Sequence, residues 1–151
     1  MSIGEICNRE IIVINKDSTI EEAAKLMRKH HVGTLVVVDE SKKMGNAIPV
    51  GILTDRDIVI EVIAEEVALN TIIVGDVMSD ELLTVREVDG IWETMQRMRG
   101  RGIRRVPVVN EAGELAGILA IDDLLELLAE ELADLSKLIK REHHREQETR
   151  A

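Results

Sequence analysis

The sequence contains almost no aromatic side chains, with one Trp, no Phe and no Tyr among 151 residues. Proteins that bind single-stranded nucleic acids commonly stack the bases on aromatic side chains, and that device is nearly absent here. Basic residues are the minority, with 19 Lys and Arg against 29 Asp and Glu and a net charge of -10. Because this charge repels a polyanion, we do not expect nucleic acid as the main partner.

Cysteine is equally scarce, and long apolar runs are missing. Cys7 is the single cysteine, so no intramolecular disulfide can form, and no Cys/His spacing typical of zinc sites occurs. No run approaches the roughly 20 apolar residues that span a bilayer, and the first residues lack the basic and apolar regions of a signal peptide. We therefore expect no membrane insertion and a cytoplasmic location with Cys7 reduced.

An internal duplication organises what is present. A shift of 71 residues aligns Gly4 with Gly75, and a shift of 66 aligns Gly51 with Gly117. The offset changes by five where the first copy has the longer loop, between residues 39 and 50, and insertions are tolerated at such loops. The sequence therefore predicts two copies of one unit, in residues 1–70 and 71–128, followed by an extension over residues 129–151.

Each copy is expected to fold as strand, helix, strand, strand, helix. In the first copy the strands are expected at residues 11–14, 34–38 and 50–53. One helix is expected after a cap at Asp17-Ser18, and the other from Thr54-Asp55 onward. In the second copy they are expected at residues 82–85, 89–100, 106–109, 116–119, and from Ile121-Asp122 onward. One unit alone would expose an apolar sheet face, so the predicted fold is α/β (α+β), with the two units packed as a pseudo-twofold pair.

Four short motifs carry a family resemblance. They are GILTDRDI at residues 51–58, GIRRVPVV at 102–109, VGDVMS at 74–79 and GILAIDDL at 117–124. In this order they resemble cystathionine-β-synthase (CBS) domains, and the tandem pair over residues 3–128 resembles a Bateman module. The resemblance implies a regulatory module that binds an adenosine nucleotide between the repeats without chemistry of its own.

Thr54 and Asp57 are the predicted ribose ligands. They stand three residues apart where a strand becomes a helix, so Thr54 can cap the helix and Asp57 faces its positive end. A carboxylate held there can accept hydrogen bonds from both hydroxyls of a ribose, although a plain capping box without ligand has the same spacing. In the second copy Asp123 matches Asp57, but Ala120 replaces the threonine, which predicts a weaker or empty second site.

The remaining site residues follow from the resemblance. Basic residues at the position of Arg104 and Arg105 meet ligand phosphates in the family, and arginine suits that role as a multidentate donor. The first copy has Gly33 and Thr34 there, which offer close backbone approach and a hydroxyl. The adenine is expected among aliphatic side chains and one threonine, namely Val13, Val32, Ile103 and Thr84.

An apolar stripe continues beyond the second repeat. Ile121, Leu125, Leu128, Leu132, Leu135 and Ile139 are separated by 4, 3, 4, 3 and 4 residues, which is the a/d pattern of a coiled coil. We expect residues 128, 132, 135 and 139 to form the seam of a homodimer; the alternative is that they pack on their own module. The polar residues from Lys140 onward are expected to fray.

The sequence therefore predicts a non-enzymatic sensor whose regulatory ligand is AMP, with ATP, ADP or S-adenosylmethionine as alternatives, and with no catalytic cofactor or metal. A regulated enzyme or transporter would sense the bound state. The alternative is a constitutive interaction protein with degenerate ligand clefts, which the alanine at position 120 favours. An enzyme ranks third, because no acid–base or nucleophile set emerges.

Overall fold

A computed structural model of the chain describes residues 1–42 and 47–150. It is divided into two compact units, Met1–Leu119 and Ala120–Ala151. The first unit holds two three-stranded sheets, one for each repeat, and the second holds one long helix. The predicted mixed α/β class is thereby confirmed. Part of the longer first-copy loop, at residues 43–46, lies outside the described residues, as does Ala151.

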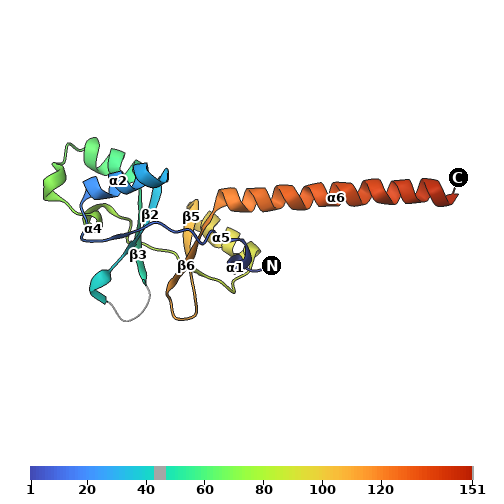
Figure 1. Ribbon diagram of the computed structural model, residues 1–151, viewed down its shortest axis with the longest axis horizontal. Coiled ribbons are helices and arrows are strands. Elements are labelled where there is room, and N and C mark those ends of the chain that lie inside the picture. Colours follow the sequence, from blue (N-terminus) through green and yellow to red (C-terminus); the bar gives the residue numbers. More distant parts are fainter. Residues whose placement is uncertain (43–46, 151) are drawn as a thin grey trace. The chain divides into compact units, whose positions relative to one another are not determined.

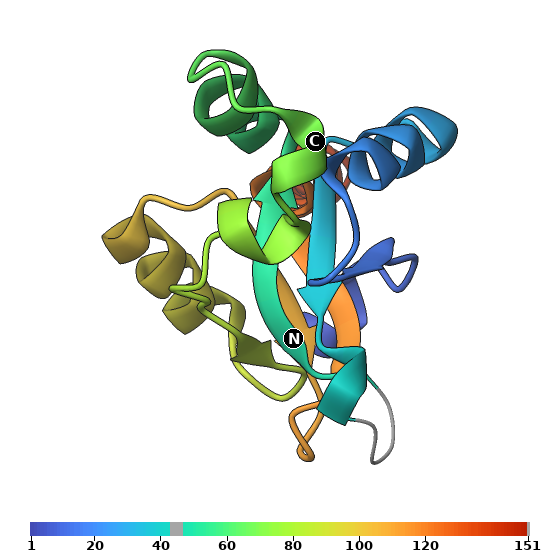
Figure 2. The same cartoon turned by 90° about the vertical axis from the view of Figure 1, so that its left-hand side faces the viewer.

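The first repeat contains α1 (Ile3–Ile6), β1 (Val13–Asn15), α2 (Ile20–His30), β2 (Thr34–Val38), η1 (Glu40–Lys42), β3 (Pro49–Thr54), α3 (Asp55–Asp57), the π-helix η2 (Ile58–Ile63) and η3 (Leu69–Thr71). Strand β2 pairs parallel with β1 and antiparallel with β3, so the predicted hairpin is present (Figure 2). Residues 35–38 are all buried, as expected of a central strand covered on both faces.

The second repeat contains α4 (Val74–Val77), β4 (Val85–Arg86), α5 (Ile91–Arg101), β5 (Arg105–Val109) and β6 (Leu115–Ala120). Strand β4 pairs parallel with β5, and the pair Val85 and Val108 corresponds to the pair Ile14 and Val37 of β1 and β2. The second unit is α6, a continuous helix over Ile121–Arg150 (Figure 1). The helix continues through the polar residues from Lys140 to Arg150, and an Arg150–Glu146 ion pair of 3.0 Å lies in its last turn. Fraying of this end stays a prediction.

Two sequence predictions are corrected. The predicted cap Asp17-Ser18 is wrong by one residue, because Thr19 caps α2. Its hydroxyl oxygen accepts a 3.1 Å hydrogen bond from the Glu22 N–H, and the Thr19 N–H donates to Glu22 Oε2 at 3.2 Å. The first strand of each copy also begins later than predicted, because pairing with β2 and β5 sets the register at Val13 and Val85.

The leading helix of each repeat docks on the other repeat. The backbone N–H groups of Val74 and Gly75 donate to carbonyls of Ser18 and Lys16 at 2.8 Å, and those of Ile3 and Gly4 donate to Asp89 and Glu87 at 3.0 and 2.8 Å. These two sets of contacts are related by the shift of 71 residues. The repeats therefore exchange their leading helices, which gives the predicted pseudo-twofold pair a physical basis.

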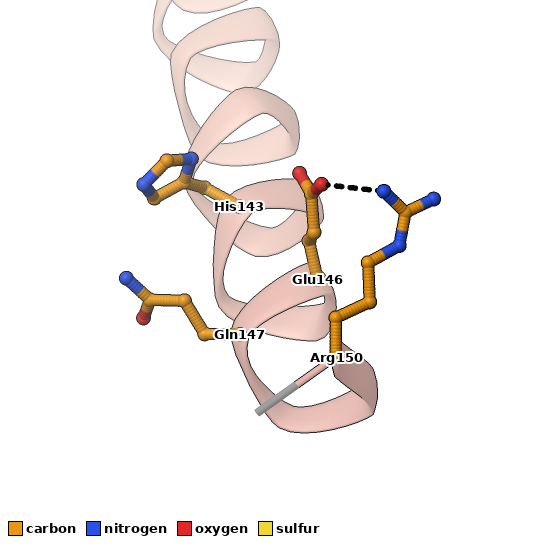
Figure 3. A pocket seen from close by; sticks show the side chains of 4 residues that line it. All are labelled: His143, Glu146, Gln147 and Arg150. Atoms are coloured by element: carbon orange, nitrogen blue, oxygen red, sulfur yellow. Dashed lines mark hydrogen bonds and ion pairs between the residues drawn. The ribbon is translucent and has the colours of Figure 1, made fainter.

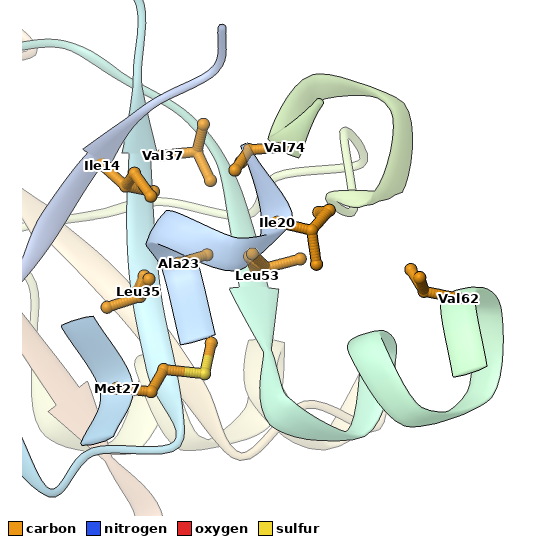
Figure 4. Packing of buried hydrophobic residues seen from close by; sticks show 9 residues of the cluster. All are labelled: Ile14, Ile20, Ala23, Met27, Leu35, Val37, Leu53, Val62 and Val74. Atoms are coloured by element: carbon orange, nitrogen blue, oxygen red, sulfur yellow. The ribbon is translucent and has the colours of Figure 1, made fainter. Parts of the chain in front are cut away.

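The exchange also completes the core of the first repeat. Val74 of α4 joins eight buried side chains of that repeat, Ile14, Ile20, Ala23, Met27, Leu35, Val37, Leu53 and Val62 (Figure 4). On the other side Arg9, which follows α1, forms an ion pair with Glu87 and donates 3.1 and 2.8 Å hydrogen bonds to two backbone carbonyls. The hydrogen bond to Glu87 raises the pKa of the Arg9 guanidinium. Neither repeat is thus packed without the other.

Thr94 in α5 is a buried polar exception. It corresponds to Ala23 of the first repeat, is fully buried, and its hydroxyl oxygen has no hydrogen-bond partner among residues 1–42 and 47–150. Because an unsatisfied buried hydroxyl costs about 1–3 kcal/mol, Thr94→Val should raise the free energy of unfolding by about 1–2 kcal/mol in urea titrations. Thr149→Val, at an exposed hydroxyl bonded to the Arg145 carbonyl, is the control and should give no gain. A loss of stability for Thr94→Val would contradict this reading of the core.

Candidate functional site

The turn from β3 into α3 fixes the first two predicted ligand residues. The Asp57 N–H donates to Thr54 Oγ1 at 3.1 Å, and the Thr54 N–H donates to Asp57 Oδ2 at 2.9 Å. This reciprocal pair is the capping box that the sequence allowed as an alternative. It engages one carboxylate oxygen, so Asp57 Oδ1 and the hydroxyl hydrogen of Thr54 keep hydrogen-bonding capacity in a fixed geometry. Capping and ligand binding are therefore compatible at this turn.

The corresponding turn of the second repeat has half of this arrangement. The Ala120 N–H donates to Asp123 Oδ2 at 2.9 Å, but the alanine has no hydroxyl to return the bond. Asp123 is thus oriented by one bond instead of two. The asymmetry predicted from the sequence is present in the local geometry.

A cavity of about 690 Å³ lies beside the first turn. Its lining comes from both repeats, and in the second repeat it includes the segment between α4 and β4. The lining residues are Gly33, Thr34, Ile52, Thr54, Asp55, Arg56, Asp57, Ser79, Glu81, Leu82, Leu83, Gly102, Ile103, Arg104 and Arg105. Because residues so distant in sequence meet here, the cavity is formed only when the repeats are paired.

Seven of the eleven predicted ligand residues line this cavity. They are Thr54, Asp57, Gly33, Thr34, Ile103, Arg104 and Arg105. The described lining does not include the other four. Val13 is 41% exposed on β1, Val32 packs against the first-repeat core, the carbonyl of Thr84 accepts a 3.0 Å bond from Arg97, and Asp123 belongs to the second unit.

Sequence reasoning missed part of the apolar lining. The sequence predicts Leu82 and Leu83 in a strand, but the strand begins at Val85, and the two leucines line the cavity instead. Ile52 does so from β3, where its backbone exchanges 3.0 and 3.3 Å hydrogen bonds with Ser79. Side chains alternate between the two faces of a strand, and in β3 Gly51 and Leu53 are buried whereas Ile52 is half-buried. This alternation could have indicated that Ile52 faces the cavity.

The sequence predicts that the ligand approaches the backbone of Gly33 closely, but in the structure the Asp55 side chain lies there. A Cβ at this position would lie 2.9 Å from Asp55 Oδ2, and the Asp55 N–H donates to the Gly33 carbonyl at 2.9 Å. A carboxylate, which repels phosphate, therefore occupies the space beside Gly33. The neighbouring hydroxyl oxygen of Thr34 is buried and has no partner within the described part of the chain.

The charged groups around the cavity balance. Asp55, Asp57 and Glu81 contribute three carboxylates, and Arg56, Arg104 and Arg105 contribute three guanidinium groups. Arg105 begins β5, Arg104 directly precedes it, and both are exposed. A ligand that carries both an anionic group and neutral hydroxyls can therefore find partners of both kinds here.

Two other hollows are less suited to a nucleotide. One, near the end of α6, is lined by His143, Glu146, Gln147 and Arg150, all exposed on a single helix (Figure 3). The other, of about 330 Å³, has a described lining of seven residues that includes three carboxylates and no basic group. Within residues 1–42 and 47–150 no group of three or more His, Cys, Asp or Glu is arranged to hold a metal ion. Nor does any described helix have the length and apolarity to cross a membrane.

Comparison with known proteins identifies the family. The model of the CBS domain matches residues 3–64 and 74–130, so the chain belongs to the CBS-domain family as a tandem pair. An uncharacterized protein of Methanopyrus kandleri is 35% identical over 127 residues, which is 84% of this chain and 62% of that protein. The chain thus spans less than two thirds of this relative.

Two solved structures extend the comparison. A protein with CBS domains from Burkholderia ambifaria superposes with a TM-score of 0.73 at 26% identity, covering 85% of this chain and 93% of that one. The CBS domain pair of protein MJ0100, in complex with 5′-methylthioadenosine and S-adenosyl-L-methionine, has a TM-score of 0.71 at 27% identity, covering 85% and 99%. CBS pairs of this fold therefore include one that binds adenosine-containing ligands.

Proposed function

We propose that this chain is a non-enzymatic sensor that binds an adenosine nucleotide, AMP above all, in the 690 Å³ cavity. The observation that carries the proposal is the meeting of Thr54 and Asp57 of the first repeat with Arg104 and Arg105 of the second around one space. ATP, ADP and S-adenosylmethionine remain alternative ligands. The complex of MJ0100 supports a ligand that contains adenosine.

The ribose is assigned to the capped turn. Asp57 Oδ1 would accept hydrogen bonds from the two ribose hydroxyls, and the Thr54 hydroxyl would add a third contact. Hydrogen bonds to a charged group contribute about 1.5–3 kcal/mol each. The capping box supports this role because it holds the carboxylate in place before the ligand arrives.

The adenine is assigned to the apolar lining, against Ile103 of the second repeat. Ile52, Leu82 and Leu83 line the same space and take the place that the resemblance gave to Val13, Val32 and Thr84. The sole aromatic residue, Trp92, is not among the described lining residues, so the base would be held by aliphatic packing without ring stacking.

The phosphate is assigned to the side of Arg104 and Arg105, with the buried hydroxyl of Thr34 as a further donor. Gly33 lines the cavity, but the Asp55 carboxylate beside it disfavours a phosphate there. Replacing both arginines with Ala should therefore weaken AMP at least about tenfold while adenosine weakens less than threefold, since only AMP carries the charge. Calorimetric titration of both ligands measures this. Equal losses would mean that the arginines support the fold instead of the phosphate.

The signal would pass through the exchanged helices. Ile52 and Ser79 line the cavity and also join β3 to the segment after α4 through their backbone hydrogen bonds. A ligand that binds one arrangement of this junction more tightly shifts the population toward it. A regulated enzyme or transporter would then sense that arrangement. The proposal includes a cytoplasmic location, where the single thiol of Cys7 stays reduced.

A constitutive interaction protein is the second candidate, because the second turn has lost its hydroxyl at Ala120. A thermal-shift panel over AMP, ADP, ATP, NAD and S-adenosylmethionine separates the two functions, since a ligand that binds only the folded state raises Tm. The sensor function predicts a saturable rise with at least one adenosine ligand. An unchanged Tm throughout the panel favours the constitutive function.

A further inference from the structure

Helix α6 carries an apolar stripe that no described residue of this chain covers. Leu128, Leu132, Leu135 and Ile139 are 44%, 67%, 56% and 66% exposed. Every described residue from position 128 to 150 is exposed. An apolar stripe of this length on a soluble surface marks an interaction site.

The spacing of the stripe specifies a helix as its cover. Separations of 4 and 3 residues keep the side chains along one seam of a helix, which is the a/d pattern of a coiled coil. A lipid surface fits poorly, because interfacial helices carry Lys and Arg on the polar face and residues 121–136 contain none. A second amphipathic helix is therefore the matching partner.

The charge of α6 is divided along its length. Residues 121–136 contain six acidic and no basic residues, whereas residues 137–150 contain five basic and three acidic residues and two histidines. Two copies aligned in parallel would place the acidic halves together. Two antiparallel copies would place each acidic half beside the basic half of the other, which is the favourable arrangement.

The four seam residues are also self-complementary in the antiparallel direction. With a twofold axis between Ala133 and Asp134, Leu128 meets Ile139 of the other copy and Leu132 meets Leu135. All four apolar positions then pair with one another, as an isologous interface requires. We propose that α6 forms an antiparallel coiled coil with α6 of a second copy in this register.

Cysteine crosslinking of the full chain tests the direction, in a Cys7→Ser background. Leu128→Cys and Ile139→Cys chains are mixed and oxidised, and the crosslinked species are resolved by mass spectrometry. In the antiparallel register residue 128 lies beside residue 139, whereas two copies of residue 139 are about 16 Å apart, beyond disulfide reach. The mixed crosslink is expected to dominate. A dominant 139–139 crosslink, or none above that of an Ala133→Cys control, would overturn the proposal.

A charged substitution tests the seam independently. Leu132→Glu should weaken self-association at least about 100-fold, because two leucines per dimer lose their burial. Ala133→Glu adds the same charge one residue away, off the seam, and should weaken it less than tenfold. Light scattering over a dilution series measures both, with circular dichroism to confirm that the helix persists. Equal effects of the two variants, or a wild-type chain that stays monomeric, would refute the seam.

Discussion

Replacing Asp57 with Ala is expected to weaken AMP binding at least about 100-fold. The substitution removes the acceptor of two charge-assisted ribose hydrogen bonds, which contribute about 1.5–3 kcal/mol each. It also removes the bond to the Thr54 N–H, so the affinity is to be compared at a temperature where the variant is folded. Isothermal titration calorimetry measures the dissociation constant.

Two variants serve as controls for Asp57→Ala. Asp76→Ala removes the same kind of cap, a 3.0 Å bond from the Ile73 N–H, at a carboxylate outside the described lining of the 690 Å³ cavity. It should leave affinity within about threefold. Asp123→Ala should cost less than Asp57→Ala, because its turn is closed by one bond only. Equal losses for the two repeats, or a larger loss for Asp123, would reverse the ranking of the sites.

The second large effect is expected on stability. At Gly51 an added Cβ would lie 2.5 Å from Met78 Sδ and 2.8 Å from the Ser79 carbonyl oxygen. The methionine can move, but the backbone carbonyl belongs to the pairing between Ile52 and Ser79. Gly51→Ala should therefore lower the free energy of unfolding by about 2–4 kcal/mol.

Gly100 provides the matched control, because the same atom is added there to open space on an exposed turn of α5. Gly100→Ala should raise the free energy of unfolding by about 0.5–1 kcal/mol, as expected for Gly to Ala inside a helix. Urea titration followed by circular dichroism measures both variants. A shift of the same sign for the two would show that contact between β3 and the segment after α4 does not control stability.

The duplication made much of the fold predictable from the sequence. Strand β2 was predicted with its observed bounds, and β3, β5 and β6 were each placed within one residue at either end. Strands β2 and β5 are β-branched runs, and β3 and β6 both carry Gly-Ile-Leu after a turn, so the signal of all four is local. The first strands were displaced because pairing to a distant strand sets their bounds.

The exchange of α1 and α4 was beyond the reach of sequence reasoning. Four-residue helices have no periodicity to detect, and their contacts lie between 56 and 86 residues away in the chain. Gly51 and Gly117 were recognised as landmarks of the repeat. Their physical reason, the close approach of Met78 and Ser79 to one and of Cys7 and Asn8 to the other, requires the tertiary structure.

The candidate site was predictable where the motif itself supplies the residues. Thr54, Asp57 and the pair Arg104 and Arg105 follow from two contiguous strings of sequence. The adenine lining depends on the path of the segment between α4 and β4, so the sequence points to Val13 and Thr84 whereas Leu82 and Leu83 line the cavity. The obstruction of Gly33 by the Asp55 carboxylate is likewise a tertiary feature.

The measurement that tests the account most directly is calorimetric titration of the wild-type chain with AMP, beside the Asp57→Ala variant. The turn at Thr54 and Asp57 has both capping hydrogen bonds and borders one cavity, so we expect saturable binding of about one AMP per chain. The variant is expected to lose that binding. Binding that persists unchanged in Asp57→Ala would contradict the assigned site. Absence of binding by AMP, ADP, ATP and S-adenosylmethionine to the wild-type chain would contradict the sensor function itself.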